Sequence, residues 1–392
     1  MKLTINLTVP SILITLGVLL QRATSLSSSP LSSQTLNSFS SQNFDMHITS
    51  LHRYAVKGLS GDSMQSVILN ENDGTFEDDR RYALLFDNSE GARKFDENDP
   101  KWLHKDNFLC AFTAPELLAT LRTEYKVESD SGKRLLSVWN RNDSEPSNSD
   151  GLLLLADLAS QVGRDETSEF CSELCGKKVV CICASDNAKS STSQNEEVDD
   201  DVKSNAAQLG GTHTHQFGNT SSGVKNNNED TRTIHIVNSN TVKQFSDAIQ
   251  HELTQQYKVK NSDETDETDP IQLNPTRFRP NIVVDCLDPW LEFDLIGKTI
   301  EVIPKQDSKD TIEHDLKSVP LRFRITSRTV RCAGIGVDPL QPELGALDIP
   351  KLLTKHFPQH GPYLGVYAVV EKDDDYNGGE IRVGDSFRVL EE

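Results

Sequence analysis

Short strand-like runs make up most of the hydrophobic pattern in the first half of the chain. They lie at residues 46–56, 67–69 and 82–86, and glycine and aspartate residues separate them. Short apolar runs bounded by turn-forming residues are typical of β-strands. The first half is therefore predicted to consist mainly of short strands, with one helical insert at residues 115–123.

The second half contains one amphipathic helix followed by more short strands. Residues 233–237 are expected to form a strand, and Thr241 can cap the helix that follows it. One face of that helix carries the apolar residues Val242, Phe245, Ile249 and Leu253. Further strands are expected at residues 282–284, 300–303, 321–325 and 365–370, with a tight turn at Asn377-Gly378 before a closing run at 381–390. Many short strands with few helices predict a mainly β (α+β) fold built around a β-barrel.

Length and composition divide the chain into segments. Its 392 residues exceed one ordinary core, which predicts two domains with additional segments. Residues 184–229 are rich in Ser, Asn, Asp and Gln, and their few large apolar side chains cannot offset the entropy of ordering the segment. This segment is predicted to be a disordered insertion. His213 and His215 within it are expected to be solvated rather than metal ligands.

The first 45 residues differ from the rest of the chain. Residues 1–44 contain Lys2 and Arg22 but no acidic residue, and a short apolar run at residues 12–20 precedes small residues at a cleavage spacing. This pattern is typical of a signal or transit peptide and predicts delivery to an organelle, either the mitochondrion or the plastid. The alternatives are the secretory pathway and an uncleaved membrane anchor, because residues 3–20 just reach the length of a membrane span.

Charge and cysteine content exclude two classes of protein. The formal net charge of -20 opposes binding to nucleic-acid phosphates. Seven cysteines, an odd number in a long chain, favour reduced thiols over a disulfide framework. Four of them lack the spacing of zinc knuckles or plant-type iron–sulfur ligands. The four are Cys171, Cys175, Cys181 and Cys183. The segment that contains them is instead predicted to be a helix end, a cap at Gly176 and a strand.

Cys332 is the candidate reactive residue. A thiolate ligates a soft metal or carries sulfane sulfur, and Arg331 and Arg328 would favour the charged form. Gly334 and Gly336 would let the backbone come close to a ligand. The alternative is an ordinary buried cysteine in a strand, and these residues alone leave both interpretations open.

The sequence around Cys332 resembles that of a known family. Residues 331–339, Arg-Cys-Ala-Gly-Ile-Gly-Val-Asp-Pro, are similar to the signature of the MOSC family, the C-terminal domain of molybdenum cofactor sulfurases. Residues 278–285 resemble the family's Phe-Arg-x-Asn strand, and residues 363–371 and 378–390 resemble its closing strands. Residues 52–69 and 77–86 resemble the N-terminal β-barrel that precedes MOSC in the mitochondrial amidoxime-reducing component and its bacterial relatives. Together these matches run in family order from about residue 48 to residue 391.

The resemblance implies a domain organisation. The first 45 residues would be the signal or transit peptide or anchor. A smaller MOSC N-terminal β-barrel domain would then precede the MOSC β-barrel, whose helix–strand start would be separated from its main part by the insertion. The corresponding ranges are 1–45, 46–150, 151–183, 184–229 and 230–392.

The resemblance also implies a molybdenum–pterin cofactor in a cleft between the two domains. Cys332 matches the cysteine that ligates molybdenum, and Arg331 would face the pterin phosphate. Arg279 and Asn281 match the Phe-Arg-x-Asn pair, in which the guanidinium suits a phosphate and the amide can pair with pterin edges. The other matching cofactor positions are Lys57, Gly58 in place of a serine, Arg80 with Arg81 as the register alternative, Thr231 and Tyr367.

Each of these positions also has a purely structural interpretation. Lys57 can be a solvated turn lysine, and the arginines can pair with the abundant surface acids. Asn281 can be a strand-edge amide, Thr231 can only begin a strand, and Tyr367 can pack in the core.

The implied function is that of a molybdenum-dependent oxidoreductase that reduces N-oxygenated or similar small substrates. Because ferredoxin-type cysteine spacing is absent, electrons are expected from a separate protein of the cytochrome b5 or ferredoxin type. The alternative is a persulfide carrier, or a module that binds and delivers molybdenum cofactor without turnover. Pyridoxal phosphate is implied only by the association with the family, and the sequence shows no site for it. The protein is expected to be a monomer.

Overall fold

The computed structural model describes much of the chain after residue 45. The predicted leader at residues 1–45, the predicted insertion at residues 184–229, and Thr231 all lie outside the described residues. Within the described part, no helix combines the length and apolar character that a membrane crossing needs. The described residues are 46–69, 74–89, 93, 104–141, 151–183, 233–260, 270–285, 287–305, 320–372, 376 and 378–390.

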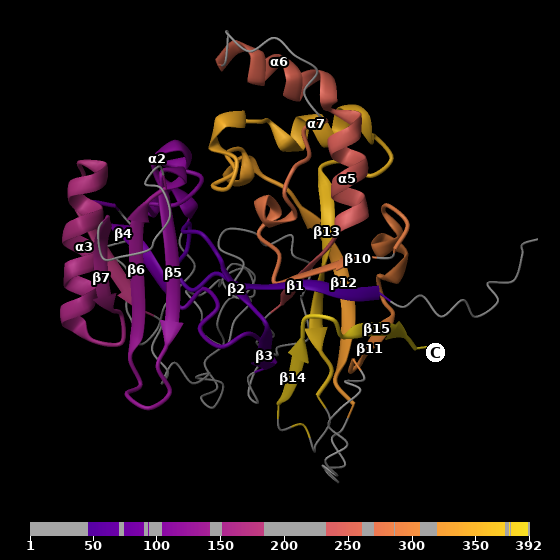
Figure 1. Cartoon of the computed structure of the whole chain (residues 1–392), viewed down its shortest axis with the longest axis horizontal. Helices are drawn as coiled ribbons and strands as arrows, with labels where there is room; N and C mark the ends of the chain where they lie inside the picture. The colour runs from indigo at the N-terminus through magenta and orange to yellow at the C-terminus, as the bar shows by residue number, and fades with distance from the viewer. Residues whose placement is uncertain are drawn as a thin grey trace, which may run out of the picture. The chain divides into compact units, whose positions relative to one another are not determined.

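The largest sheet closes into a β-barrel (Figure 1). Its eight strands follow the order β10-β9-β13-β12-β11-β15-β1-β2, and the additional pairing of β10 with β1 closes a barrel of 7 strands. The fold is therefore mainly β with few helices, as predicted. The strands of this sheet are β1 (Met46–Arg53), β2 (Asp62–Met64), β9 (Ile234–Asn238), β10 (Ile282–Asp285), β11 (Thr299–Ile303), β12 (Arg322–Val330), β13 (Tyr363–Val370) and β15 (Ser386–Val389).

Strand β1 belongs to this barrel and corrects the predicted domain boundary at residue 46. It runs antiparallel to β10, with Leu51 opposite Ile282, and to β15, with Met46 opposite Phe387. These side chains and Ile48 are buried in one hydrophobic core. Because the strands that cover the apolar face of β1 come from the C-terminal part, β1 cannot belong to a separate N-terminal domain.

The other N-terminal strands form smaller sheets. Among the described residues these sheets are separate, so the predicted N-terminal barrel stays a prediction. One antiparallel sheet contains β5 (Leu121–Val127), β6 (Arg134–Asn140) and β7 (Leu152–Asp157). Two further pairs join β4 (Tyr82–Phe86) to β8 (Val179–Cys183), and β3 (Ser66–Leu69) to β14 (Gly379–Arg382).

Residues 151–183 complete the N-terminal part instead of beginning the second domain. They contain β7, helix α3 (Gln161–Cys175) and β8, and α3 packs against both strands. Cys171 and Cys181 share a buried core with Leu84 and Tyr125. The apolar face of α3 is thus covered by N-terminal strands, which corrects the predicted assignment of this segment.

The predicted glycine cap and the predicted strand of this cysteine-rich stretch, now β8, are confirmed. Gly176 caps α3 in the left-handed conformation with φ of 66°. Cys171 and Cys181 are 4% and 3% exposed in the core. Among the described residues, no group of three or more His, Cys, Asp or Glu side chains could hold a metal ion.

The helices agree with the sequence in their apolar faces but differ in their ends. In α5 (Ser239–Ala248) and the residues just after it, the predicted face is buried at 0% to 1% exposure. Asn238 caps α5, whereas Thr241 lies inside the helix and bonds to Glu292. The predicted insert at residues 115–123 is shorter, because α2 (Pro115–Ala119) ends before β5 begins at Leu121. The remaining helices are α6 (Gln250–Lys260) and α7 (Ile349–His356).

Candidate functional site

Cys332 lies just after β12, where the chain enters the short 3-10 helix η5 (Ala333–Ile335). Its side chain is exposed, so the interpretation as a buried strand cysteine is wrong. The backbone at Gly334 lies close to the sulfur. A Cβ atom added there would lie 3.6 Å from the Cys332 Sγ atom. The thiol is therefore open to a ligand.

Four basic side chains gather beside Cys332 and form what we call the basic site. They come from the turn after β1, the loop before β4, the residue after the 3-10 helix η3 (Pro275–Phe278), and the end of β12. Their charges act on one another, and those of Lys57 and Arg331 also act on Cys332. Segments far apart in sequence thus converge on one thiol. The members are Lys57, Arg80, Arg279 and Arg331.

Lys57 is buried, at 8% exposure, which excludes the solvated turn lysine. Burial lowers the pKa of its ammonium group to about 7. The thiols of Cys110 and Cys332 oppose this shift, while Arg80 and Arg279 add to it. A lysine in such surroundings gains charge when an anion arrives, because the anion offsets both burial and like-charge repulsion.

Gly58 has a steric reason to be glycine. Its φ is +93°, and a Cβ at this position would lie only 2.6 Å from the Cys110 Cα atom. A serine here would be strained and would require Cys110 to move. Gly58 therefore allows close backbone packing beside Lys57.

The structure separates Arg80 from its register alternative. Arg80 lies over the ring of Tyr54, with 5.5 Å between the guanidinium carbon and the ring centre, and its charge acts on Lys57 and Arg331. Arg81 instead donates to Asp78 Oδ1 at 3.1 Å. Arg80 is therefore the arginine of the basic site, and Arg81 is a structural residue.

Arg279 also packs against the ring of Tyr54. Its guanidinium carbon lies 4.3 Å from the centre of the Tyr54 ring, and its Nη1 donates to the Leu59 carbonyl at 2.8 Å. Its backbone has φ of 54°, in the left-handed region, where it ends η3. Burial lowers the pKa of Arg279 to about 10, and the charge of Arg80 adds to the shift. This side chain remains charged at neutral pH.

His235 links two members of the basic site and was not predicted. Its Nδ1 lies 3.2 Å from the Arg279 carbonyl oxygen, and its Nε2 lies 3.5 Å from Arg331 Nη1. A neutral imidazole protonated on Nδ1 satisfies both contacts, by donating to the carbonyl and accepting from Arg331. Burial, followed by the charge of Arg331, holds the pKa of His235 well below its usual value.

Arg331 and Tyr367 lie on either side of His235. Arg331 Nη2 donates to the Phe278 carbonyl at 2.8 Å, and the ring centres of Tyr367 and His235 are 5.4 Å apart. Tyr367 also interacts with Arg331 and Cys332 through their charges. Tyr367 is buried, at 6% exposure, so it both packs in the core and borders the basic site.

The basic site has more positive charge than the acids near it offset. Three guanidinium nitrogens are buried and have no hydrogen-bond partner within the described part of the chain: Arg80 Nε, Arg279 Nη2 and Arg331 Nε. Asp79 Oδ2 comes no closer than 3.8 Å to Arg80 Nε. Buried donors of this kind are costly unless a ligand supplies acceptors. The arrangement fits an anion.

Three other predicted positions have different outcomes. The Asn281 amide accepts from the His235 N–H at 3.1 Å and donates to the His52 carbonyl at 3.3 Å, which favours the strand-bridging interpretation. Arg328 packs over the Phe293 ring at 4.4 Å, so it is directed to an aromatic side chain. Thr231 lies outside the described residues.

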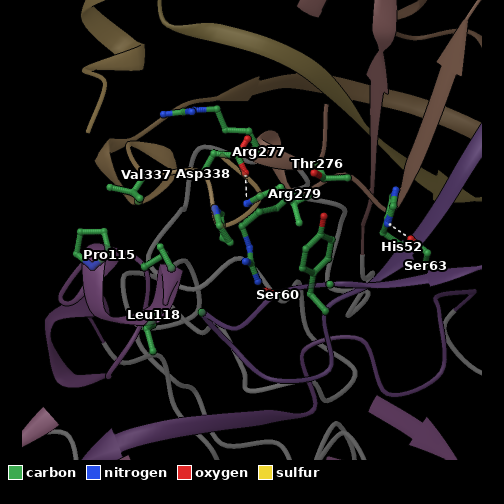
Figure 2. A pocket seen from close by; sticks show the side chains of 18 residues that line it. His52, Ser60, Ser63, Pro115, Leu118, Thr276, Arg277, Arg279, Val337 and Asp338 are labelled. Atoms are coloured by element: carbon green, nitrogen blue, oxygen red, sulfur yellow. Dashed lines mark hydrogen bonds between the residues drawn. The ribbon is translucent and has the colours of Figure 1, made fainter. Parts of the chain in front are cut away.

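A cavity of about 130 Å³ adjoins the basic site between N-terminal and C-terminal segments. Figure 2 shows Pro115 and Leu118 with Val337 at one end and His52 with Ser63 at the other. Arg279 lines both the cavity and the basic site, and Gly334 places the cavity next to Cys332. A small ligand there would lie beside the sulfur.

The barrel and the basic site define a β-barrel protein with a cluster of basic side chains beside an accessible thiol. Residues 213–388 match the family model of the MOSC domain, so this part of the chain is a MOSC domain. MOSC domains bind molybdenum cofactor. The matched residues include Arg279, Arg331 and Cys332, while β1 completes the barrel from outside them. The chain matches none of the curated proteins with which it was compared.

Proposed function

We propose that this protein binds a molybdenum–pterin cofactor at the basic site, with Cys332 as the protein ligand of the metal. The observation that carries the proposal is the set of buried, unpartnered guanidinium nitrogens of Arg80, Arg279 and Arg331 beside an exposed thiol, within the described residues. A phosphate offers several acceptors to arginine forks, and a thiolate suits a soft metal. The donor set therefore fits both ends of such a cofactor.

The residues of the basic site would hold this group and would not transfer protons to a substrate. Arg80, Arg279 and Arg331 would bind the phosphate, and Lys57 would add a charge that strengthens when the anion is present. His235 would hold Arg331 and Arg279 in place. When bound, the cofactor supplies two-electron oxygen-atom chemistry that amino-acid side chains lack.

We further propose reduction of N-oxygenated or similar small substrates as the activity. The exposure of Cys332 supports it, because a substrate must reach the metal that Cys332 holds. Electrons would come from a separate protein of the cytochrome b5 or ferredoxin type. The same exposure also favours one alternative, in which Cys332 carries a persulfide or the protein delivers the cofactor without turnover.

Metal analysis of the full chain, produced with molybdenum cofactor available, tests the proposal. We expect bound molybdenum in the wild type and in Cys175→Ser, since the Cys175 thiol lies at the end of α3 and donates to the Ser172 and Lys177 carbonyls. Cys332→Ser should reduce the metal to background. Molybdenum that is unchanged in Cys332→Ser would refute the ligand assignment.

Turnover separates the two candidate functions. Reduction of benzamidoxime with an artificial electron donor by the molybdenum-loaded protein would support the oxidoreductase. Bound molybdenum or sulfane sulfur on Cys332 without turnover would support the carrier. Circular dichroism of each variant, compared with wild type, would establish that the fold is retained.

A further inference from the structure

The cavity beside the basic site has one apolar end and one polar side. Pro115 and Leu118 from α2 face Val337, Pro339 and Leu340 from the segment after η5. Figure 2 shows Pro115, Leu118 and Val337 on one side of the cavity, Asp338 and Arg279 nearer its middle, and Arg277 along its upper edge. This polarity suits a ligand with an apolar body and a single polar group.

Size limits what the cavity can hold. An apolar protein cavity of about 150 Å³ holds one benzene ring. A cavity of about 130 Å³ therefore fits a single ring or a short branched chain, and it is too small for a pterin with its phosphate. The cavity and the proposed cofactor position are thus different, although Arg279 borders both.

Charge indicates the polar group. Arg277 and Arg279 are positive, Asp338 is a carboxylate, and His52 is neutral because burial lowers its pKa to about 4. The lining therefore has one net positive charge. A ligand with one negative charge would neutralise it.

Unpartnered donors point to the same group. Arg277 is 1% exposed and donates to the carbonyls of Ile335 and Gly336, while its Nη1 is buried without a partner in the described residues. The hydroxyl of Tyr54, at 2% exposure, is also buried and has no partner there. Both residues line the cavity. A carboxylate has two oxygens that can accept from such donors.

We propose that this cavity binds a small carboxylic acid with a single-ring or short branched apolar body. The body lies between Leu118 and Val337, and the carboxylate faces Arg277, Arg279 and Tyr54. Because Gly334 lines the cavity and adjoins Cys332, the N-oxygenated substrate would carry such a carboxylate and apolar body, a conclusion that rests on the proposed function. The binding itself does not depend on the cofactor.

Titration of the full chain with benzoate and with benzamide tests the binding. The two probes share a shape, but only benzoate has the charge. We expect benzoate to bind about tenfold more tightly, since hydrogen bonds to charged groups are stronger than neutral ones. Equal affinities, or no benzoate binding at millimolar concentration, would overturn the proposal.

Variants locate the bound probe. Leu118→Trp fills the cavity from α2 and should weaken benzoate binding at least about tenfold, as should Leu340→Trp at a position that is 50% exposed and can accept a larger side chain. Leu153→Trp is the matched control, because Leu153 is 47% exposed on β7 and does not line the cavity. Benzoate binding that is unchanged in both cavity variants would overturn the assignment.

A second comparison distinguishes this proposal from the proposed function. Arg331→Met should reduce bound molybdenum and leave benzoate binding intact. Benzoate binding lost in Arg331→Met and retained in Leu118→Trp would place the probe in the basic site and refute the cavity. Molybdenum retained with no benzoate binding would refute the cavity alone.

Discussion

Two clusters of arginines, one that contains Arg80 and one that contains Arg81, differ in how their charges are offset. Around Asp78, whose side chain is fully buried, Oδ1 accepts from Arg81 at 3.1 Å and Oδ2 accepts from Arg134 at 2.8 Å and Tyr125 at 2.7 Å. In the basic site, Arg80 and its partners retain unsatisfied nitrogens among the described residues. Adjacent residues, Arg80 and Arg81, therefore belong to different environments.

The difference distinguishes a cluster that stabilises the fold from a candidate binding site. A buried carboxylate with several donors supplies the counter-charge of its arginines from within the protein. In the basic site, three arginines and one lysine lie close together beside a thiol. Their positive charges repel one another until an anion binds. Removing one charge should therefore destabilise the first cluster and stabilise the second.

The largest effect is expected at Asp78. Replacing it, as Asp78→Asn, leaves the guanidinium groups of Arg81 and Arg134 without their counter-charge and weakens the bond from Tyr125. Breaking a buried ion pair in this way costs about 3 kcal/mol of unfolding free energy. Urea denaturation of variant and wild type measures it, and a loss below about 1 kcal/mol would contradict the structural role.

Arg80→Met and Arg81→Met should act in opposite directions. Arg80→Met should raise the unfolding free energy by about 1 kcal/mol, because a buried like charge is removed, and weaken pyrophosphate binding about tenfold. Arg81→Met should lower stability and leave pyrophosphate affinity within about twofold. Calorimetric titration at pH 7 measures the affinity, and similar losses for both variants would remove the distinction between the clusters.

Much of this contrast could not be predicted from the sequence. The motif that contains Cys332, Arg331 and the neighbouring glycines identified the thiol and its family, and short apolar runs predicted the barrel. Arg80 and Arg81 stood as register alternatives because the direction of each side chain depends on tertiary packing. Asp78 and Arg80 both have positive φ, 59° and 58°, which local pattern does not reveal.

His235 and Tyr54 were missed for a related reason. His235 lies in a strand that was predicted from the apolar residues around it. Its side chain is buried in the structure, at 5% exposure. A polar side chain within a buried strand is a signal that sequence contains, because such residues are buried only when they have partners. The partners themselves, Arg279 and Arg331, lie far along the chain and become neighbours only in the fold.

Glu292 sharpens the comparison, because it is a buried acid that forms no ion pair with any of the described residues. Its Oε2 accepts from Asn238 and Thr241, at 3.1 and 2.9 Å, and burial raises its pKa to about 7. Since the folded pKa exceeds the unfolded one, the stabilising contribution is complete below about pH 4.5 and is lost as pH rises through about 7.

Glu292→Gln should therefore remove about 1 kcal/mol of the fall in stability between pH 5 and pH 8. Unfolding free energies measured at the two pH values for variant and wild type test this expectation. An identical pH dependence in both proteins would show that Glu292 does not titrate in this range.

The smallest effect concerns Lys57, whose pKa is about 7 in the basic site. An anion favours the charged ammonium, so binding takes up a proton and weakens as pH rises above about 7. Sulfate keeps a constant charge in this range and is therefore the suitable probe. We expect its affinity to fall about threefold between pH 7 and pH 8 in the wild type, and to remain level in Lys57→Met. The same titration affects the free energy of unfolding. Because the folded-state pKa of Lys57 is lowered, its contribution to stability is complete above about pH 10.5 and is lost as pH falls through about 7. Sulfate affinity that declines equally in both proteins would assign the titration to another group and would leave Lys57 outside the anion site.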